Sequence, residues 1–240
     1  MLVAFEGIDG SGKGTQARLL CDRARREGFT SRVISFPQYG QNVFADAIVD
    51  YLAGRFGSVD EVHGKLAALL YAGDRFSTKS TLEDMVRENE LVVCDRYVPS
   101  NAAYQAAKLP QAERIKFIRW LYSVEYGAFK LPEPQLVLLL DMPVSDAQRL
   151  VSKKPPRDQL GLFADDAPLG YTSQKADIHE VDSSFLGRCR EVYEYLAEND
   201  SHGSWIKLSC VDGRGRLKAR ESISEETWEA VEKYGLRSHN

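Results

Sequence analysis

Short, mainly apolar runs recur along the chain, each bounded by glycine, proline or polar residues. Runs of this kind are typical of buried β-strands. Longer segments separate them, and within those segments the apolar residues recur at helical spacing. Strands that alternate with helices predict an α/β fold, in which a parallel sheet is covered by helices on both faces.

The predicted strands are residues 2–5, 32–36, 91–94, 136–140 and 205–208. The predicted helices are residues 13–28, 43–53, 61–77, 82–89, 100–108, 111–126, 144–153, 181–199 and 225–234. Between residues 154 and 175 the pattern gives way to prolines, glycines and charges of both signs. A long segment without structure in a compact domain is more often functional than a spacer, so we predict a mobile insert here. The charged residues after Asp212 predict a solvated tail.

Composition narrows the class of protein. The chain has 240 residues, 43% of them hydrophobic and 28% charged, which is enough for one large core and predicts a single domain over residues 1–240. A net charge of −4 provides no basic field for nucleic acid and favours a free nucleotide as partner. The four cysteines lack metal-ligand spacing, which predicts reduced thiols, a cytoplasmic location and no zinc. Neither a membrane span nor a signal peptide is predicted.

A glycine-rich segment lies between the first predicted strand and the first predicted helix. In such a loop the backbone N–H groups converge on phosphate oxygens, the positive end of the helix faces them, and a lysine reaches the outer phosphates. We therefore predict that ATP binds here, through Gly7, Gly10, Ser11, Gly12, Lys13, Gly14 and Thr15. Gly14 occupies the position at which such loops usually carry a serine or threonine that ligates Mg²⁺. Thr15 follows about 100° further round the helix.

Two aspartates end buried strands and compete for the role of magnesium ligand. Asp95 follows the run of residues 91–94, and Asp141 follows residues 136–140. The carboxyl ends of such strands are where open α/β sheets bind ligands, and a carboxylate there can hold Mg²⁺ through its waters. We favour Asp95 because Arg96 follows it, and arginine grips phosphate in a bidentate manner.

Five local features, in their order along the chain, resemble the nucleoside monophosphate kinases and, within them, the thymidylate kinase family. They are an acidic residue in the glycine loop, a Phe-Pro pair after the second strand, a tyrosine four residues before an arginine, an Asp-Arg-Tyr block and an acidic end to the insert: Asp9, Phe36-Pro37, Tyr71 with Arg75, residues 95–104 and residues 177–180. The resemblance covers nearly the whole chain. It implies the P-loop nucleoside-monophosphate-kinase fold with a five-stranded parallel sheet, a mobile lid over about residues 153–177, and a homodimer.

The residues agree with a site for dTMP. Tyr71 and Arg75 share a helix face, so the ring can stack on a pyrimidine while the guanidinium donates to its exocyclic oxygen; the alternative is a core tyrosine and a surface arginine. Asn101 suits the N3–H and carbonyl edge of thymine, or else caps a helix. The resemblance implies that Phe36 belongs to this site and that Tyr104 lies beneath the deoxyribose, leaving no room for a 2′-hydroxyl.

The resemblance also implies which residues carry the reaction. Lys13 holds the donor phosphates and Arg96 holds the acceptor phosphate. Asp9 contacts the 3′-hydroxyl of the acceptor or the coordination shell of Mg²⁺. Asp95 holds the Mg²⁺ through its water ligands.

Two departures from the family pattern affect these expectations. Gly10 stands where one branch of the family carries its catalytic arginine, so we expect the lid to supply that cation. The candidates are Lys153, Lys154, Arg157 and Lys175, and we select the arginine, Arg157. The second departure is Gln38, which stands where relatives commonly have arginine after Phe-Pro, so one phosphate contact is neutral or comes from elsewhere.

These observations predict an enzyme that moves the γ-phosphoryl of ATP onto dTMP, with Mg²⁺ as cofactor. Adenylate kinase is an alternative because residues 12–16 also resemble its loop, but Asp9 stands where that family has proline. A deoxynucleoside kinase does not need the phosphate-gripping Arg96. A non-catalytic nucleotide switch requires a guanine-reading Asn-Lys-x-Asp run, which the sequence lacks.

Overall fold

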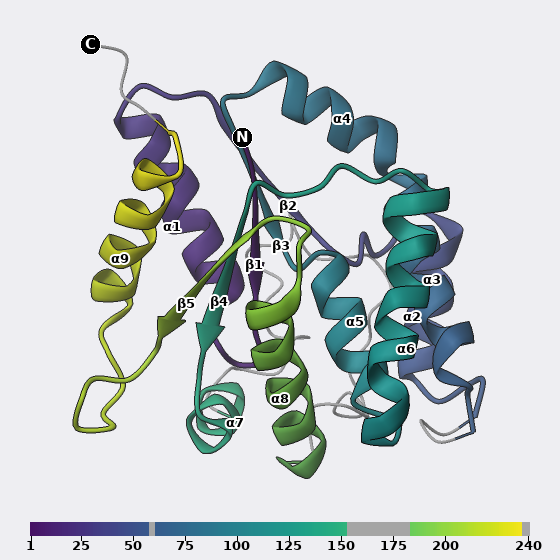
Figure 1. Ribbon diagram of the computed structural model, residues 1–240. Helices are drawn as coiled ribbons and strands as arrows, with labels where there is room; N and C mark the ends of the chain where they lie inside the picture. Colours follow the sequence, from purple (N-terminus) through teal and green to yellow (C-terminus); the bar gives the residue numbers. More distant parts are fainter. Residues whose placement is uncertain (58–60, 153–182, 237–240) are drawn as a thin grey trace.

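A computed structural model describes residues 1–57, 61–152 and 183–236. At its centre is a five-stranded sheet with the strand order β2-β3-β1-β4-β5, in which every pair of neighbours is parallel (Figure 1). The strands are β1 (Leu2–Glu6), β2 (Ser31–Ser35), β3 (Leu91–Asp95), β4 (Leu136–Asp141) and β5 (Ser204–Ser209). All five predicted strands are confirmed, together with the α/β class.

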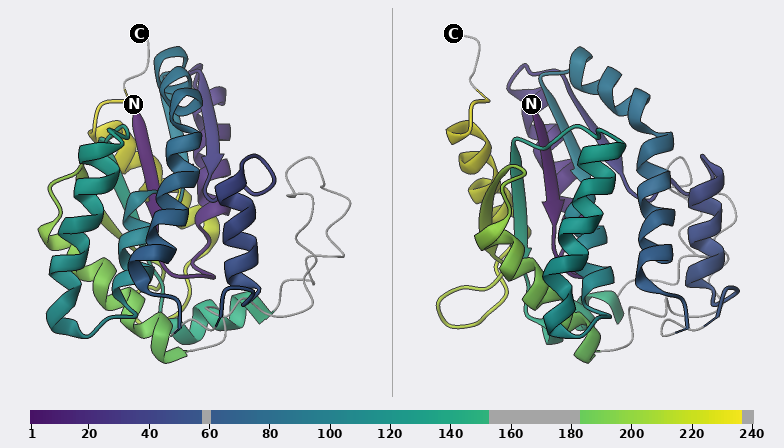
Figure 2. Two further views of the ribbon diagram at one scale, coloured as in Figure 1. Left: turned by 90° about the vertical axis from the view of Figure 1, so that its right-hand side faces the viewer. Right: turned by 45° about the vertical axis from the view of Figure 1, so that its right-hand side comes forward.

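Helices cover both faces of the sheet (Figure 1). Helices α1 and α9 pack side by side on one face, and α5, α6 and α8 pack against one another on the opposite face, with α2 and α3 beyond them (Figure 2). The helical elements are α1 (Lys13–Arg26), α2 (Val43–Leu52), α3 (Gly64–Ser77), α4 (Lys79–Glu88), α5 (Val98–Ala106), α6 (Gln111–Tyr122), the π-helix η1 (Ser123–Ala128), α7 (Val144–Ser152), α8 (Ser183–Asn199) and α9 (Arg220–Lys233).

The sheet brings two loops together at one edge. Strand β1 lies in the middle and pairs with β3 in a register that sets Phe5 opposite Asp95. The glycine loop after β1 and the Arg96 turn after β3 therefore start side by side. This is the edge at which parallel sheets bind ligands.

The end of the chain differs from the prediction. A solvated tail was expected after Asp212, but α9 starts five residues before the predicted helix and packs on α1. Ile223, Trp228 and Val231 of α9 are buried, and Arg23 of α1 lies 4.7 Å from the centre of the Trp228 ring. The charged residues between them lie on the solvent-exposed face of α9. Because they are numerous, the composition of this segment does not indicate the apolar stripe.

The helix predicted over residues 111–126 is also corrected, because it changes into the π-helix η1 after Tyr122. The predicted mobile insert lies outside the described residues. Over the part of the chain that the structure describes, every helix is too short or too polar to cross a membrane.

Candidate active site

The glycine loop has the backbone geometry of a phosphate cradle. Gly7, Gly10 and Gly12 adopt φ angles of 140°, 85° and 91°, in the region that favours glycine. At Gly10 a Cβ would also collide with the carbonyl group of Ala147 in α7. The loop can therefore keep this path only with glycine at these positions, and it leads directly into the first turn of α1.

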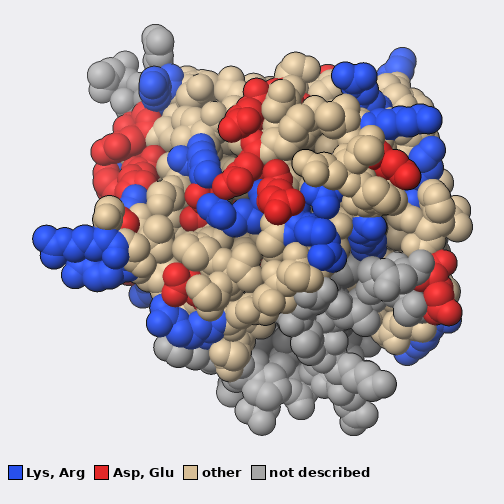
Figure 3. Space-filling model, turned by 60° about the horizontal axis from the view of Figure 1, so that its bottom comes forward, with Lys and Arg blue, Asp and Glu red and all other residues tan. Residues whose placement is uncertain are grey.

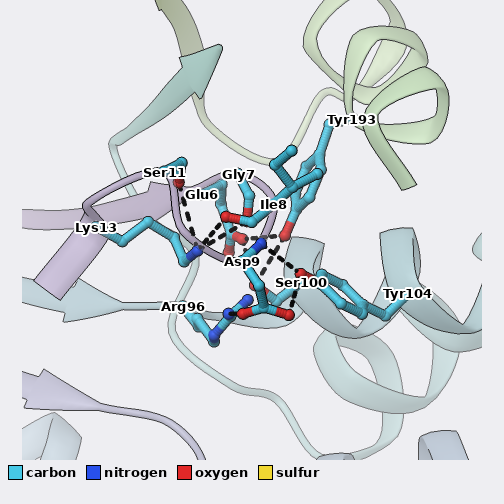
Figure 4. A network of polar contacts seen from close by, with 10 residues as sticks. All are labelled: Glu6, Gly7, Ile8, Asp9, Ser11, Lys13, Arg96, Ser100, Tyr104 and Tyr193. Carbon is cyan, nitrogen blue, oxygen red and sulfur yellow. Dashed lines mark hydrogen bonds and ion pairs between the residues drawn. The ribbon is translucent and has the colours of Figure 1, made fainter. Parts of the chain in front are cut away.

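Lys13 folds back over this loop (Figure 4). Its Nζ donates to the carbonyl oxygens of Gly7 and Ile8, both at 2.9 Å, and the residue is 5% exposed. Burial lowers the pKa of Lys13 to about 8, because the charged form loses its hydration. The phosphates of a bound nucleotide would add negative charge beside this ammonium group, next to that of the Asp9 and Asp95 carboxylates.

Asp9, Arg96 and Tyr104 meet beside the loop (Figure 4). Arg96 forms an ion pair with Asp9, and the Tyr104 hydroxyl donates to Asp9 Oδ2 at 2.7 Å and accepts from the Asp9 N–H at 2.9 Å. Burial opposes the charge on Arg96, but the Asp9 carboxylate outweighs it and holds the pKa of Arg96 well above its ordinary value. The structure thus joins three predicted residues, which come from the loop, from the turn after β3 and from α5.

The backbone of Arg96 explains how its side chain reaches the loop. Its φ angle is 68°, a left-handed conformation that is unfavourable by about 1–3 kcal/mol for residues other than glycine. The Arg96 N–H donates to the Phe5 carbonyl of β1 at 3.1 Å, which anchors this turn. The guanidinium then lies 5.4 Å from the centre of the Tyr104 ring.

The structure adds a buried carboxylate that sequence reasoning missed. Glu6, the last residue of β1, is 0% exposed and accepts hydrogen bonds from the Tyr97 N–H at 2.8 Å, the Tyr193 hydroxyl at 3.0 Å and the Ser100 hydroxyl. Burial raises the pKa of Glu6, and these donors oppose that rise. The carboxylate joins α5 and α8 to the start of the loop. The available signal was a glutamate directly after the apolar run of residues 2–5 and before the glycine loop.

Gly14 and Asp95 lie in direct contact. A Cβ at Gly14 would be 2.7 Å from Asp95 Oδ2, so a serine or threonine here would displace the carboxylate. Asp141, the alternative ligand, accepts from Arg190 Nε at 2.7 Å and lies 3.1 Å from Lys207 Nζ. Burial alone would raise the pKa of Asp141, but these two cations hold it below its ordinary value. Because Asp141 is already paired with two cations, Asp95 is the better candidate for the magnesium ligand beside the loop.

The predicted base-binding residues Arg75 and Asn101 also come together, although not on the surface. Arg75 is 2% exposed and donates from Nε and Nη2 to the carboxylate of Glu125 at 2.5 and 2.7 Å. Asn101 Nδ2 donates to the same carboxylate at 2.8 Å. Tyr71 is partly buried beside them on α3, and Phe36 is buried after β2. Neither Glu125 nor its position in a π-helix was predicted.

Asp74 is a third buried carboxylate, after Glu6 and Glu125, that sequence reasoning missed. It accepts from the Gln38 N–H at 3.1 Å and from Asn42 Nδ2 at 2.7 Å. Burial raises the pKa of Asp74, against the effect of the Asn42 hydrogen bond. The side chain of Gln38 donates to the Ser35 carbonyl, so it folds back onto β2. Asp74 thereby fixes the segment that follows Phe36.

The face at this edge of the sheet carries basic and acidic side chains interspersed among uncharged ones (Figure 3). Among the described residues, no group of three or more His, Cys, Asp and Glu side chains is arranged to hold a metal. Mg²⁺ needs only one or two protein carboxylates when phosphates and water complete its shell. The oxygen donors of Asp95 and Asp9 fit that requirement. The four lid candidates, Lys153, Lys154, Arg157 and Lys175, lie outside the described residues.

Comparison with known proteins decides the family. The family model for thymidylate kinase matches residues 5–167, which include the glycine loop, Arg75, the Asp95-Arg96 turn and Asn101. The chain belongs to the thymidylate kinase family. A thymidylate kinase of Mycobacterium tuberculosis (strain H37Rv) is 32% identical over 219 residues, which are 91% of this chain and 96% of that protein.

Two further proteins agree with this assignment. A probable thymidylate kinase of Pyrococcus abyssi is 34% identical over 155 residues, which are 61% of this chain and 67% of that protein. The solved structure of thymidylate kinase from Candida albicans superimposes with a TM-score of 0.68 at 21% identity, covering 97% of this chain and 91% of that one. That likeness confirms the predicted P-loop kinase fold.

Proposed function

We propose that this thymidylate kinase family member transfers the γ-phosphoryl group of ATP to dTMP, giving ADP and dTDP. One observation carries the proposal: the glycine loop with Lys13 and the ion pair of Arg96 with Asp9 lie side by side at one edge of the sheet. A donor phosphate chain in the loop and an acceptor phosphate on Arg96 would then face each other. Phosphoryl transfer depends chiefly on such alignment and on cations near the transferring group.

Each residue then has a definite part in the reaction. The loop N–H groups and Lys13 bind the donor phosphates, and Lys13 exchanges the carbonyls of Gly7 and Ile8 for phosphate oxygens. Arg96 orients the acceptor phosphate, while Asp9 holds Arg96 in place. Arg157, in the lid that we propose over about residues 153–177, supplies a further cation and excludes water when the lid closes.

Asp95 and Asp9 are the residues that would hold Mg²⁺, through its water ligands. When bound, the ion neutralises charge that develops on the phosphate oxygens. Gly14 contributes indirectly, because its missing side chain leaves the Asp95 carboxylate against the loop.

We assign the acceptor base to Tyr71 and Arg75 of α3 and to Asn101 of α5. Tyr71 stacks on thymine, Arg75 donates to its exocyclic oxygen, and Asn101 binds its N3–H edge. Phe36 closes one side of the base, and Tyr104 lies beneath the sugar.

A coupled assay with ATP and a panel of acceptors tests the proposed function. Turnover with dTMP should exceed turnover with AMP and with thymidine. A preference for AMP would support an adenylate kinase, and a preference for thymidine would support a deoxynucleoside kinase. ATP hydrolysis that none of the acceptors changes would contradict all three kinases.

Sugar selection by Tyr104 gives a prediction of its own. A 2′-hydroxyl on the acceptor must displace the Tyr104 ring or be buried without a hydrogen-bond partner, which is unfavourable by roughly 1–3 kcal/mol. The kcat/KM for dTMP should therefore exceed that for the corresponding ribonucleotide by about 10- to 100-fold. Tyr104→Ala should narrow this ratio. Tyr104→Phe is the matched control, because it removes the hydrogen bonds to Asp9 but keeps the ring. If Tyr104→Ala keeps the full ratio, the ring does not select the sugar.

We also propose that the enzyme is a homodimer that pairs through α3. Leu66, Leu69 and Phe76 recur on one face of α3 and are 63%, 38% and 50% exposed. Val43 of the neighbouring α2 is 76% exposed, and Figure 2 shows α2 beside α3. Several large exposed apolar side chains on neighbouring helices are typical of a protein interface.

Sedimentation or light scattering tests this assignment. Leu66→Glu should convert a dimer into a monomer, because the charge would be buried in the interface. Tyr234→Glu is the matched control, since Tyr234 is 40% exposed at the end of α9, on the opposite side of the molecule. A wild-type monomer at micromolar concentration would refute the dimer.

The proposed compartment is the cytoplasm. Cys21, Cys94, Cys189 and Cys210 are all buried and unbridged, as expected of a protein that remains in a reducing environment.

A further inference from the structure

Two buried side chains of the base-binding region donate to one carboxylate oxygen. Glu125 Oε1 accepts from Arg75 Nη2 at 2.7 Å and from Asn101 Nδ2 at 2.8 Å, while Oε2 accepts from Arg75 Nε at 2.5 Å. Glu125 is 0% exposed, Arg75 2% and Asn101 3%. Water therefore does not compete for these hydrogen bonds, and the carboxylate holds both donors in place.

The amide of Asn101 can adopt only one orientation in this setting. Its Nδ2 also donates to the Ala68 carbonyl of α3 at 3.0 Å, so both of its hydrogens are used. Rotating the amide by half a turn would place Oδ1 against two acceptor oxygens, those of Ala68 and Glu125. The nitrogen is thereby committed to the protein.

The oxygen of the same amide has no such partner. Asn101 Oδ1 is buried and accepts no hydrogen bond within the part of the chain that the structure describes. An unsatisfied buried acceptor is unfavourable, and a ligand that donates a hydrogen bond would relieve it. Asn101 lies beside the stretch of α3 that carries Tyr71 and Arg75, because Ala68 is one turn from Tyr71.

We propose that Glu125, together with the Ala68 carbonyl, fixes Asn101 so that it offers the base an acceptor and no donor. This inference rests on the proposed function, which places Asn101 at the base. Thymine and uracil carry an N3–H that satisfies this acceptor, whereas N3 of cytosine is itself an acceptor. Glu125 is thus a positioning residue that excludes cytidine nucleotides while it touches neither substrate. The π-helix η1 is the element that carries it to this position.

Glu125→Gln is the first test. The amide keeps the shape of the side chain, but only one of its two terminal atoms is an oxygen that can accept a hydrogen bond. Whichever way the introduced amide turns, one of its N–H groups faces a donor of Arg75 or Asn101, so the Asn101 amide loses its fixed orientation. The ratio of kcat/KM for dTMP to that for dCMP should fall at least about tenfold, with the KM for ATP unchanged. Glu133→Gln is the matched control, since that side chain is 54% exposed and lies on the segment after η1. It should leave the ratio as it is in the wild type.

A reciprocal exchange keeps the inference testable if Glu125→Gln alone does not fold. Asn101→Asp retains an acceptor for N3–H but brings two carboxylates together, so dTMP affinity should fall at least about tenfold. When Glu125→Gln is added to Asn101→Asp, the amide introduced at position 125 can donate to the carboxylate introduced at position 101, so the hydrogen bond between the two side chains is restored. The double variant should regain most of that affinity, and dTMP titration calorimetry measures both steps.

The outcomes separate this inference from the proposed function. If Asn101→Ala leaves dTMP affinity unchanged, Asn101 is not at the base, and the proposed base site fails. If Asn101→Ala weakens dTMP but folded Glu125→Gln keeps the wild-type ratio of dTMP to dCMP, the role of Glu125 alone is overturned. Wild-type affinity for dTMP in Asn101→Asp would overturn it as well.

Discussion

Lys13→Ala is expected to lower kcat by about 100-fold or more, by analogy with the removal of one oriented electrostatic group from a transition state. The buried ammonium group of Lys13 is held against the loop carbonyls of Gly7 and Ile8, where the donor phosphates are proposed to bind. Alanine removes that charge without changing the φ angles of the glycines that shape the loop. Steady-state kinetics with saturating ATP and dTMP measures the loss.

Lys116→Ala is the matched control for this change, because Lys116 is an exposed lysine on α6. It should retain kcat within about a factor of two, since exposed charges away from a site contribute little. The thermal midpoint of Lys13→Ala should remain close to that of the wild type. Near-normal turnover by a folded Lys13→Ala protein would remove the phosphate-loop assignment.

Arg75→Ala is expected to cause the largest loss of stability. It leaves the Glu125 carboxylate, which is 0% exposed, without its bidentate partner. Removing one member of a buried ion pair typically destabilises a protein by about 3–5 kcal/mol, which lowers the thermal midpoint by roughly 6–20 °C for a domain of this size. Differential scanning calorimetry measures the shift. The folded fraction should also bind dTMP more weakly while its ATP affinity is kept.

Arg87→Ala is the control for this prediction, because Arg87 pairs with Asp84 on the surface of α4 and its side chain is 68% exposed. An exposed pair of this kind contributes about 0–1 kcal/mol, so its loss should barely move the midpoint. Equal shifts for Arg75→Ala and Arg87→Ala would show that the buried pair with Glu125 does not stabilise the fold.

The strands and the glycine loop could be predicted because their signals are local. An apolar run such as residues 136–140 is a buried strand almost regardless of its neighbours, and a glycine loop between a strand and a helix fixes its own backbone path. The sheet edge that gathers Lys13, Asp95 and Arg96 then follows from the parallel order of the strands. This part of the site needs no knowledge of long-range contacts.

Glu6, Asp74 and Glu125 could not be predicted in the same way. Each is a buried carboxylate whose donors lie far along the chain, for example the Tyr193 hydroxyl for Glu6 and Arg75 for Glu125. A charged residue in a sequence is normally solvated, so only tertiary contacts identify the buried ones. The change from α6 to a π-helix is equally invisible, because the apolar residues continue at near-helical spacing across Tyr122.

Long-range hydrogen bonds also explain why the structure defines the role of Asn101 more narrowly than the sequence does. In the sequence alone, the Asn101 amide offers both a donor and an acceptor, and the residue could equally cap a helix. The contacts with Ala68 and Glu125 commit the donor to the protein. Asn101 also lies inside α5, which begins at Val98, and so it is not the cap of that helix.

The central claim is that the chain moves a phosphoryl group from ATP to dTMP, and product analysis tests it most directly. The purified protein is incubated with ATP, dTMP and Mg²⁺, and the nucleotides are followed by phosphorus-31 NMR. The account predicts that dTDP and ADP appear in equal amounts, with little inorganic phosphate, and that Lys13→Ala forms neither at a comparable rate. Release of ADP with inorganic phosphate and no dTDP, or no reaction of the folded wild-type protein, would contradict it.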